Sequence, residues 1–377
     1  MIRRIPDGVI PLAGGTLALL ITGVNPILLG ALADAGRLSA SGIGQAAMIE
    51  LLAMGIAAGG AGAVLKPERL KLIGLLAGLV MAAANLATFG ATGLGVVAAR
   101  AVAGLAEGVL VWISIGFIVR TVTPERWAGV YFTVQTLAQL ALAATLSGLI
   151  MVRFGVGGGF AALGVAGVLA AALALFGPDS YAPLAKGEGL SHLPSARGWI
   201  SLGGILLFAA SGVAVWIYLQ PLAHHAGLGE GVAGMAVSAS LAGQILGSAA
   251  ATVIAGRLRY VVVFLAAMII NLAVWWLLVG SPPTAVFVGV FGVTGFLGMF
   301  ASPYFVPLTI EADRTRRAAE LTGGAQLLGS AMGPFLASMV VTDQEPRTAL
   351  MLGAILLLAG VAIIAGLHFT AGKGRMQ

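Results

Sequence analysis

The sequence has few charged residues and no cysteine, and each of these absences excludes some classes of protein. Only 9% of the 377 residues are Asp, Glu, Lys or Arg. A soluble globular domain carries about 25%, so most of this surface does not face water. The absence of cysteine excludes a disulfide framework and a thiolate metal site. The net charge of +6 rests on too few residues to form a basic stripe, so we expect no nucleic-acid partner.

Long apolar runs are what the sequence has in abundance. Hydrophobic residues make up 59% of the chain, and the 56 glycines suit helices that approach one another closely. A run of about 18 or more apolar residues crosses the ~30 Å hydrocarbon layer as a helix. The sequence therefore predicts an all-α, polytopic membrane protein with twelve transmembrane helices, the first of them retained rather than cleaved. The expected spans are 8–33, 43–65, 71–90, 92–119, 128–152, 155–177, 199–222, 231–255, 260–279, 284–310, 319–341 and 348–371.

Lysine and arginine are distributed unevenly over the expected loops. With the N-terminus inside, sixteen of the 20 basic residues fall in inside segments. Three of them, Arg37, Arg153 and Arg347, fall outside, and Arg100 lies within a span. Because Lys and Arg are retained on the cytoplasmic side during insertion, both termini are expected in the cytoplasm.

The chain also shows an internal repeat. The tripeptide Arg-Leu-Lys at 69–71 recurs as Arg-Leu-Arg at 257–259, and Glu-Arg at 125–126 recurs as Asp-Arg at 313–314, both at an offset of 188. The long polar segment of the chain lies between the copies. We predict two pseudo-symmetric six-helix bundles, residues 1–177 and 199–377, joined by a cytoplasmic linker at 178–198.

The fourth expected span carries the most specific motif of the sequence. Arg100, Gly104 four residues later and Glu107 seven residues later resemble the fourth-helix arginine signature of the major facilitator superfamily. The glutamate is similar to the pattern in spinster-like lipid carriers and in several organic-anion symporters, and does not choose among them. The expected architecture resembles that superfamily over the whole chain, whereas the sequence motifs match it only in short segments. It implies a transporter fold in which helices 1, 4, 7 and 10 surround a central substrate site.

Two departures from that superfamily stand out. The loop after the second span lacks the usual Gly-x-x-x-Asp, and the matching loop after the eighth span lacks it too. If that aspartate latches one conformation, the latch here is weaker or built differently. The fifth span lacks the Gly-Pro pair typical of drug/proton antiporters, and the eleventh has Gly333-Pro334 instead. This difference counts against that antiporter subgroup.

Three ionised residues are expected inside spans: Glu50, Arg100 and Glu107. Each costs about 2.5–3.5 kcal/mol near the bilayer centre, so each must face protein or water and be paired. One interpretation is a proton-coupling site, because a low-dielectric cavity favours a neutral carboxyl and a nearby arginine favours a charged one. The other is a static ion pair that fixes helix packing. Arg100 is either a bidentate site for an anionic substrate group or the counter-ion of Glu50.

The expected depths predict which carboxylate Arg100 contacts. Glu107 shares the helix face of Arg100 but lies about 10.5 Å away along the axis. Helical side chains lean toward the N-terminus, which points Arg100 away from Glu107. Glu50 lies at nearly the same depth as Arg100, so we predict an Arg100–Glu50 pair. Asn25, at a similar level, and the carbonyls freed by Pro26 are the alternative partners.

The C-terminal half has no expected charge at membrane depth. Its candidate substrate-binding residues are Trp216, Gln244 and Tyr304, and Asn25 and Arg100 are the candidates in the other half. For the aromatic residues, the alternatives are anchoring at the membrane interface and ordinary packing. Asn25-Pro26 is expected to break the backbone hydrogen-bond ladder of the first span, either to line a cavity or as a plain packing kink.

These features predict a secondary active transporter that moves a small amphiphilic or aromatic organic molecule by alternating access, coupled to protons through Glu107 and Glu50. Sodium in place of the proton, and either direction of transport, stay open. The alternative is a non-transporting sensor or assembly factor with a transporter-like fold. The two intramembrane carboxylates are too few for a membrane-embedded enzyme, and we expect no cofactor, no metal and a monomer. The alanine and glycine content fits a bacterial cytoplasmic membrane.

Reporter fusions test the expected topology. A fusion at either terminus, or within residues 178–198, should report a cytoplasmic location, because the basic residues hold these segments inside. A periplasmic signal from either terminus would overturn the number of spans.

Overall fold

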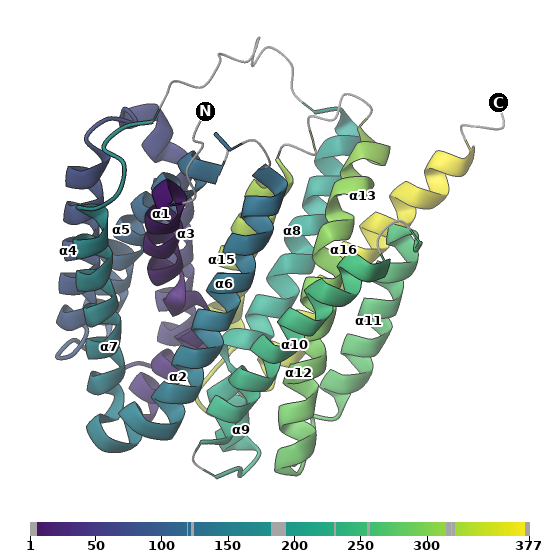
Figure 1. The fold of residues 1–377 in the computed structure, drawn as a ribbon. Coiled ribbons are helices and arrows are strands. Elements are labelled where there is room, and N and C mark those ends of the chain that lie inside the picture. Colours follow the sequence, from purple (N-terminus) through teal and green to yellow (C-terminus); the bar gives the residue numbers. More distant parts are fainter. Residues whose placement is uncertain are drawn as a thin grey trace. The chain divides into compact units, whose positions relative to one another are not determined.

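The protein is described by a computed structural model for residues 6–118, 120–121, 124–181, 194–229, 231–254, 257–313, 318 and 321–373. This part of the chain is helical apart from turns, loops and one isolated bridge between Glu68 and Ser180. The chain divides into two compact units, Met1–Gly187 and Glu188–Gln377 (Figure 1). Nine helical stretches of the described residues are long and apolar enough to cross a membrane. The predicted all-α membrane architecture is confirmed.

Unit 1 holds the first six expected spans. Span 6 continues from span 5 through a bend at Gly155, whose φ of 62° lies in the left-handed region that glycine tolerates. Its elements are α1 (Pro6–Ala18), α2 (Leu20–Asp34), α3 (Ala40–Val64), α4 (Leu70–Ala87), α5 (Leu94–Ile118), α6 (Pro124–Thr145), the π-helical turn η1 (Leu146–Ile150) and α7 (Met151–Ala174).

Unit 2 holds the other six expected spans. Its buried residues include a cluster of three phenylalanines, Phe208, Phe264 and Phe305, with ring centroids 5.2–5.7 Å apart. Phe264 and Phe305 are stacked, and Phe208 meets both edge to face. Its elements are α8 (Ala196–Ile217), α9 (Leu219–His225), α10 (Val232–Ile254), α11 (Tyr260–Trp276), α12 (Thr284–Ala301), the 3₁₀ turn η2 (Ser302–Tyr304), α13 (Phe305–Ala312), α15 (Thr322–Val340) and α16 (Thr348–Lys373).

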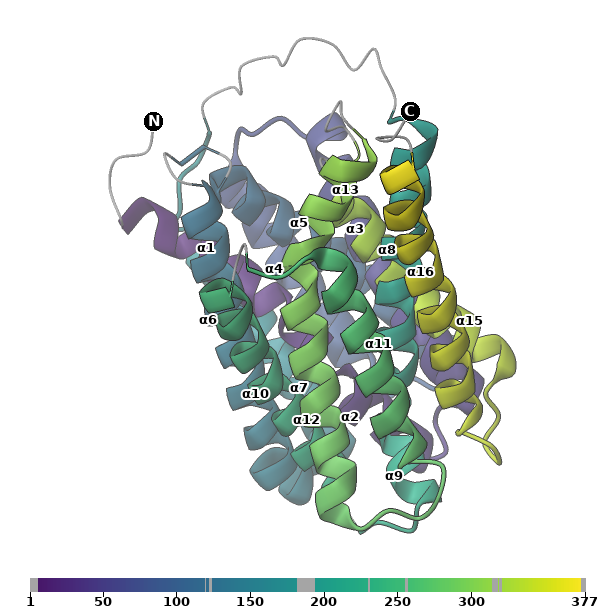
Figure 2. The same cartoon turned by 90° about the vertical axis from the view of Figure 1, so that its right-hand side faces the viewer.

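The two units pack their helices in the same pattern, as the repeat predicts. In unit 1 α3 lies on α5, α4 on α7, and α2 on α6. The equivalent spans in unit 2 make the same pairs: α10 on α12, α11 on α16, and α8 on α15 (Figures 1 and 2). The offset of 188 residues found in the loops therefore corresponds to a repeated three-dimensional arrangement within each unit.

Spans 1, 7 and 10 are interrupted. Span 7 breaks at Tyr218, between α8 and α9, and span 10 at the 3₁₀ turn η2. Span 1 breaks at Leu19, whose ψ of 2° leaves the helical region. The sequence placed that break at Asn25-Pro26, and this expectation was wrong, because α2 runs through Pro26 without ending. Proline removes a single backbone donor, which a helix tolerates when its neighbours hold it in place.

Glycines set how closely two helix pairs approach. A Cβ at Gly104 or Gly108 of α5 would overlap the backbone carbonyls of Glu50 and Met54 on α3. In unit 2 a Cβ at Gly295 of α12 would overlap the carbonyl of Ser240 on α10. The two backbones touch at these positions, as in small-residue contacts between membrane helices. Glu50 and Arg100 are therefore carried by two helices in direct backbone contact.

The loop between α3 and α4 is held by the segment after α7. The backbone N–H groups of Leu70 and Tyr181 donate to the carbonyls of Asp179 and Pro67, at 2.8 and 2.9 Å. The Tyr181 hydroxyl donates to the Ile113 carbonyl of α5 at 3.0 Å. The loop that lacks the superfamily aspartate thus has backbone and tyrosine contacts within its own unit.

The glycine contact between α10 and α12 gives a stability prediction. Gly295→Ala should destabilise unit 2 by about 1–3 kcal/mol, because the added methyl overlaps the Ser240 carbonyl and forces the helices apart. Gly298→Ala on the same helix is the matched control, since a Cβ there meets nothing within 4 Å. Thermal unfolding of the purified variants in detergent measures the difference, and equal melting temperatures would contradict the close contact.

Candidate functional site

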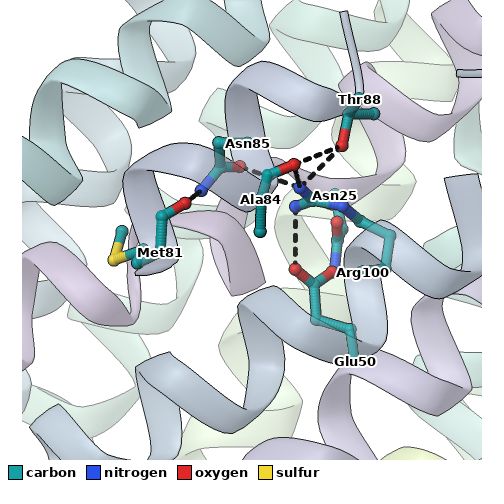
Figure 3. A network of polar contacts seen from close by, with 7 residues as sticks. All are labelled: Asn25, Glu50, Met81, Ala84, Asn85, Thr88 and Arg100. Carbon is teal, nitrogen blue, oxygen red and sulfur yellow. Dashed lines mark hydrogen bonds and ion pairs between the residues drawn. The ribbon is translucent and has the colours of Figure 1, made fainter. Parts of the chain in front are cut away.

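Arg100 lies in the interior of unit 1, fully buried, on α5. Its Nη1 donates to Glu50 Oε1 on α3 at 2.9 Å, and the two side chains have no exposed surface (Figure 3). The Arg100–Glu50 pair predicted from the sequence is confirmed. Because no water reaches either group, each charge depends on the other and on the dipoles around it.

Helix α4 supplies the acceptors for Nη2 of the guanidinium, whereas Nε has no partner among the described residues. Nη2 of Arg100 donates to Asn85 Oδ1 at 3.0 Å and Thr88 Oγ1 at 2.9 Å, with the Ala84 carbonyl at 3.4 Å. Asn85 is oriented by its own donation to the Met81 carbonyl at 2.9 Å, as Figure 3 shows. The Phe160 ring of α7 lies 5.0 Å from the guanidinium carbon, a cation–π distance. The guanidinium is enclosed by protein groups.

The second oxygen of Glu50 is also satisfied. Asn25 on α2 donates from Nδ2 to Glu50 Oε2 at 3.2 Å. Glu50 therefore accepts one hydrogen bond on each oxygen, from Arg100 and from Asn25. Four helices, α2, α3, α4 and α5, meet at this one network. Asn25, a candidate for substrate binding, lies in the network with 3% of its surface exposed.

Glu107 is as deeply buried as Glu50, but its carboxylate lacks the hydrogen-bond partners that Glu50 has. It lies two turns after Arg100 on α5, with no exposed surface. Neither of its carboxylate oxygens has a hydrogen-bond partner among the residues that the structure describes. An isolated carboxylate in such a place costs far more than a neutral carboxyl, so the surroundings favour proton uptake. Glu50 and Glu107 are thus chemically distinct although their residue type is identical.

Hydroxyl and amide side chains continue from Glu107 along unit 1. Ser114, seven residues further along α5, donates to the Pro11 carbonyl of α1 at 2.6 Å. Gln139 of α6 donates to the Leu19 carbonyl at 2.6 Å and to Thr22 Oγ1 at 2.8 Å. Gln139 therefore binds at the break in span 1.

The candidates in unit 2 lie on three different elements. Trp216 on α8 and Gln244 on α10 are half-buried, and Tyr304 in η2 is buried with 6% exposed. The Tyr304 hydroxyl has no partner among the described residues, and its ring lies 5.9 Å from that of Phe300. No hydrogen bond or ring contact joins Trp216, Gln244 and Tyr304 within the described part of the chain. These three side chains therefore do not hold one another in place by direct contact.

Sequence reasoning missed the uncharged half of the network. Asn85 and Thr88 accept hydrogen bonds from Nη2 of Arg100, and their three-residue spacing on an apolar span places them on one helix face. The same spacing rule applies to Ser114, which follows Glu107 by seven residues as Glu107 follows Arg100. A search for polar residues at helical spacing within the spans would have found these residues.

Comparison with solved structures identifies the fold. A bacterial homologue of the human lysosomal transporter Spinster, inward-facing and unoccupied, matches with a TM-score of 0.68 and 14% identity over 98% of both chains. Its occupied form matches with a TM-score of 0.64 and 14% identity over 97% of this chain and 95% of that one. The nucleoside transporter NupG matches with a TM-score of 0.76 and 12% identity over 95% of this chain and 98% of its own. The chain thus has the fold of major facilitator superfamily transporters.

Sequence comparison gives no further relative. No protein-family model and no curated protein matches this chain. The likeness is therefore one of architecture.

Breaking the ion pair of unit 1 should cost stability. Arg100→Met leaves the Glu50 carboxylate buried without its cation, which typically costs about 3–5 kcal/mol. Adding Glu50→Gln to Arg100→Met should restore part of the loss, because the amide carries no charge. Unfolding equilibria in mixed detergent micelles measure the Arg100→Met and Glu50→Gln single variants and the double variant. A double variant that is as unstable as the two single losses combined would show that the pair contributes nothing as a pair.

Proposed function

We propose that this protein is a secondary active transporter in which Glu107 is the proton-coupling residue. The transporter fold supports the general class. The observation that carries the assignment of Glu107 is its complete burial with both carboxylate oxygens unpartnered among the described residues. A structural carboxylate in a membrane span is paired, as Glu50 is. Glu107 has no such partner among the described residues, so we infer that its carboxyl binds a proton.

Arg100 and Glu50 have a different role in this proposal. Their hydrogen bonds are made to groups on α2, α3 and α4, and the guanidinium has an aromatic ring at one face. Arg100 is therefore the fixed counter-ion of Glu50 rather than the ligand of an anionic substrate. The pair holds the helices of unit 1 together and keeps a constant electrostatic field near Glu107.

Coupling follows from the difference between a neutral and a charged Glu107. While the residue is sealed from water, the neutral carboxyl is favoured because burying the charge costs several kcal/mol. When the transporter opens to one side of the membrane, water reaches the carboxyl and the proton equilibrates with that side. Alternating access then carries one proton with each cycle, in symport or in antiport.

The substrate we propose is a small amphiphilic or aromatic organic molecule. Within the predicted spans, the buried charged residues that the structure describes, Glu50, Arg100 and Glu107, lie in unit 1. The candidates of unit 2 are the uncharged residues Trp216, Gln244 and Tyr304. An aromatic surface with a few polar groups binds molecules that have an apolar ring or chain and a polar end. Asn25, whose Oδ1 has no partner among the described residues, is the proposed polar contact from unit 1. The protein is proposed to act in a bacterial cytoplasmic membrane with both termini inside.

A charge-removing substitution tests the coupling. Glu107→Gln should abolish substrate accumulation driven by a pH gradient while substrate exchange across the membrane continues, because the amide keeps the shape and cannot carry the charge. The protein is reconstituted in liposomes that contain a pH-sensitive dye. A panel of organic acids, cationic drugs and lysolipids is screened first for a compound whose transport changes the internal pH.

The control for this experiment is Glu345→Gln, which changes an exposed carboxylate in the loop before α16. It should accumulate substrate at the wild-type rate. Uphill transport at the wild-type rate by Glu107→Gln would show that another residue couples the proton.

A further inference from the structure

Polar residues recur along one face of α5 at intervals of seven. Arg100, Glu107 and Ser114 are fully buried, and two turns of helix separate each of them from the next. The first is enclosed by the network with Glu50, and the second has no partner among the described residues. The third is bonded to the Pro11 carbonyl of α1. The face continues from the ion pair toward the end of unit 1 at which α1 begins.

Helix α6 presents a second polar face to the same region. Tyr131, Gln135 and Gln139 follow one another at four-residue intervals, which places them on one side of the helix. A Cβ at Gly15 of α1 would overlap the Ser114 and Tyr131 hydroxyls, so the two hydroxyls lie at the same point. At the other end, Gln139 binds the Leu19 carbonyl.

The contacts of α1 and α2 with α5 and α3 show which residues lie at the same height along the helices. Gly15 lies at Ser114, whereas Asn25 binds the partner of Arg100. Residue numbers therefore rise along α1 and α2 as they fall along α5. The break at Leu19, midway between Gly15 and Asn25, lies at the level of Glu107, midway between Ser114 and Arg100. The seam between α1, α5 and α6 thus runs from Glu107 to Tyr131.

Three buried oxygens on α1 and α6, the helices that flank α5 here, have no hydrogen-bond partner among the described residues. They belong to Thr16, Tyr131 and Gln135. The Thr16 and Tyr131 side chains are 6% and 4% exposed. Buried polar groups of this kind are satisfied by ordered water in most proteins. Hydroxyls both donate and accept, so each is able to pass a proton to a neighbouring water without holding a charge.

We propose that the seam lined by Thr16, Ser114, Tyr131 and Gln135 binds water and conducts protons between Glu107 and the end of unit 1 at which α1 begins. The proposal rests on Glu107 as the proton carrier and names the route to it. The spacing from Glu107 to Ser114 is about 10 Å of helix rise, which two or three waters bridge at ~2.8 Å per hydrogen bond. A proton enters the chain at one end as another leaves at the other, and no other reactant is needed.

Infrared spectroscopy of the purified, reconstituted protein tests the route without a known substrate. The C=O stretch of a protonated Glu107 is the band that Glu107→Gln removes. Its rate of hydrogen–deuterium exchange after transfer to D₂O reports the access of water protons to the carboxyl. Tyr131→Phe combined with Thr16→Val should slow this exchange about tenfold or more, because two hydroxyl relays are lost.

Two controls separate the route from general damage. Thr16→Ser keeps a hydroxyl and should exchange at the wild-type rate. Ser147→Ala removes an unpartnered hydroxyl from η1 in the same unit and should also leave the rate unchanged. Wild-type exchange in the Tyr131→Phe, Thr16→Val variant would overturn the route while leaving Glu107 as the proton carrier. A spectrum in which Glu107→Gln removes no band would overturn the proposed function itself.

Discussion

The buried charge of Arg100 is the constraint on which unit 1 depends. A guanidinium within a membrane span must find acceptors, and the bilayer offers none. The chain supplies them from two other helices: a carboxylate oxygen on α3, and an amide oxygen and a hydroxyl on α4. The Asn25 amide on α2 donates in turn to that carboxylate. The glycines of α5 bring α3 into backbone contact at this level. One charge thus fixes the mutual positions of four helices.

The two halves share an architecture and differ in chemistry. At the repeat offset of 188, the positions of Arg100, Glu107 and Glu50 correspond to Val288, Gly295 and Ser238. The glycine contacts between α3 and α5 have counterparts between α10 and α12, whereas the charged residues have none there. Close helix packing at glycines is therefore common to both units, whereas the Arg100–Glu50 ion pair and Glu107 have no counterpart at the repeat offset in unit 2.

Much of the architecture was predictable from the sequence because the bilayer imposes simple rules. Apolar length predicted the helical spans, and the repeat at 188 residues predicted that the two halves are built alike, as the matching helix pairs of the two units show. The Arg100–Glu50 pair was predictable as well, since depth along a span follows from residue counting and a side chain leans toward the helix N-terminus. The break in span 1 was misplaced by two turns. Proline marks a missing donor, whereas the break at Leu19 leaves a carbonyl that Gln139 binds from another helix.

The sequence by itself determined the fold class, the repeat and the three buried charges, because these depend on composition, length and depth. Only the tertiary structure showed that Asn25 satisfies the second oxygen of Glu50, and that both oxygens of Glu107 have no partner among the described residues. Glu50 and Glu107 have the same side chain, and both lie in apolar spans. Their difference comes from lateral neighbours, Arg100 and Asn25 for Glu50 and no described partner for Glu107. Lateral contact between helices is set by packing, and a linear sequence of apolar spans does not encode it in any local pattern.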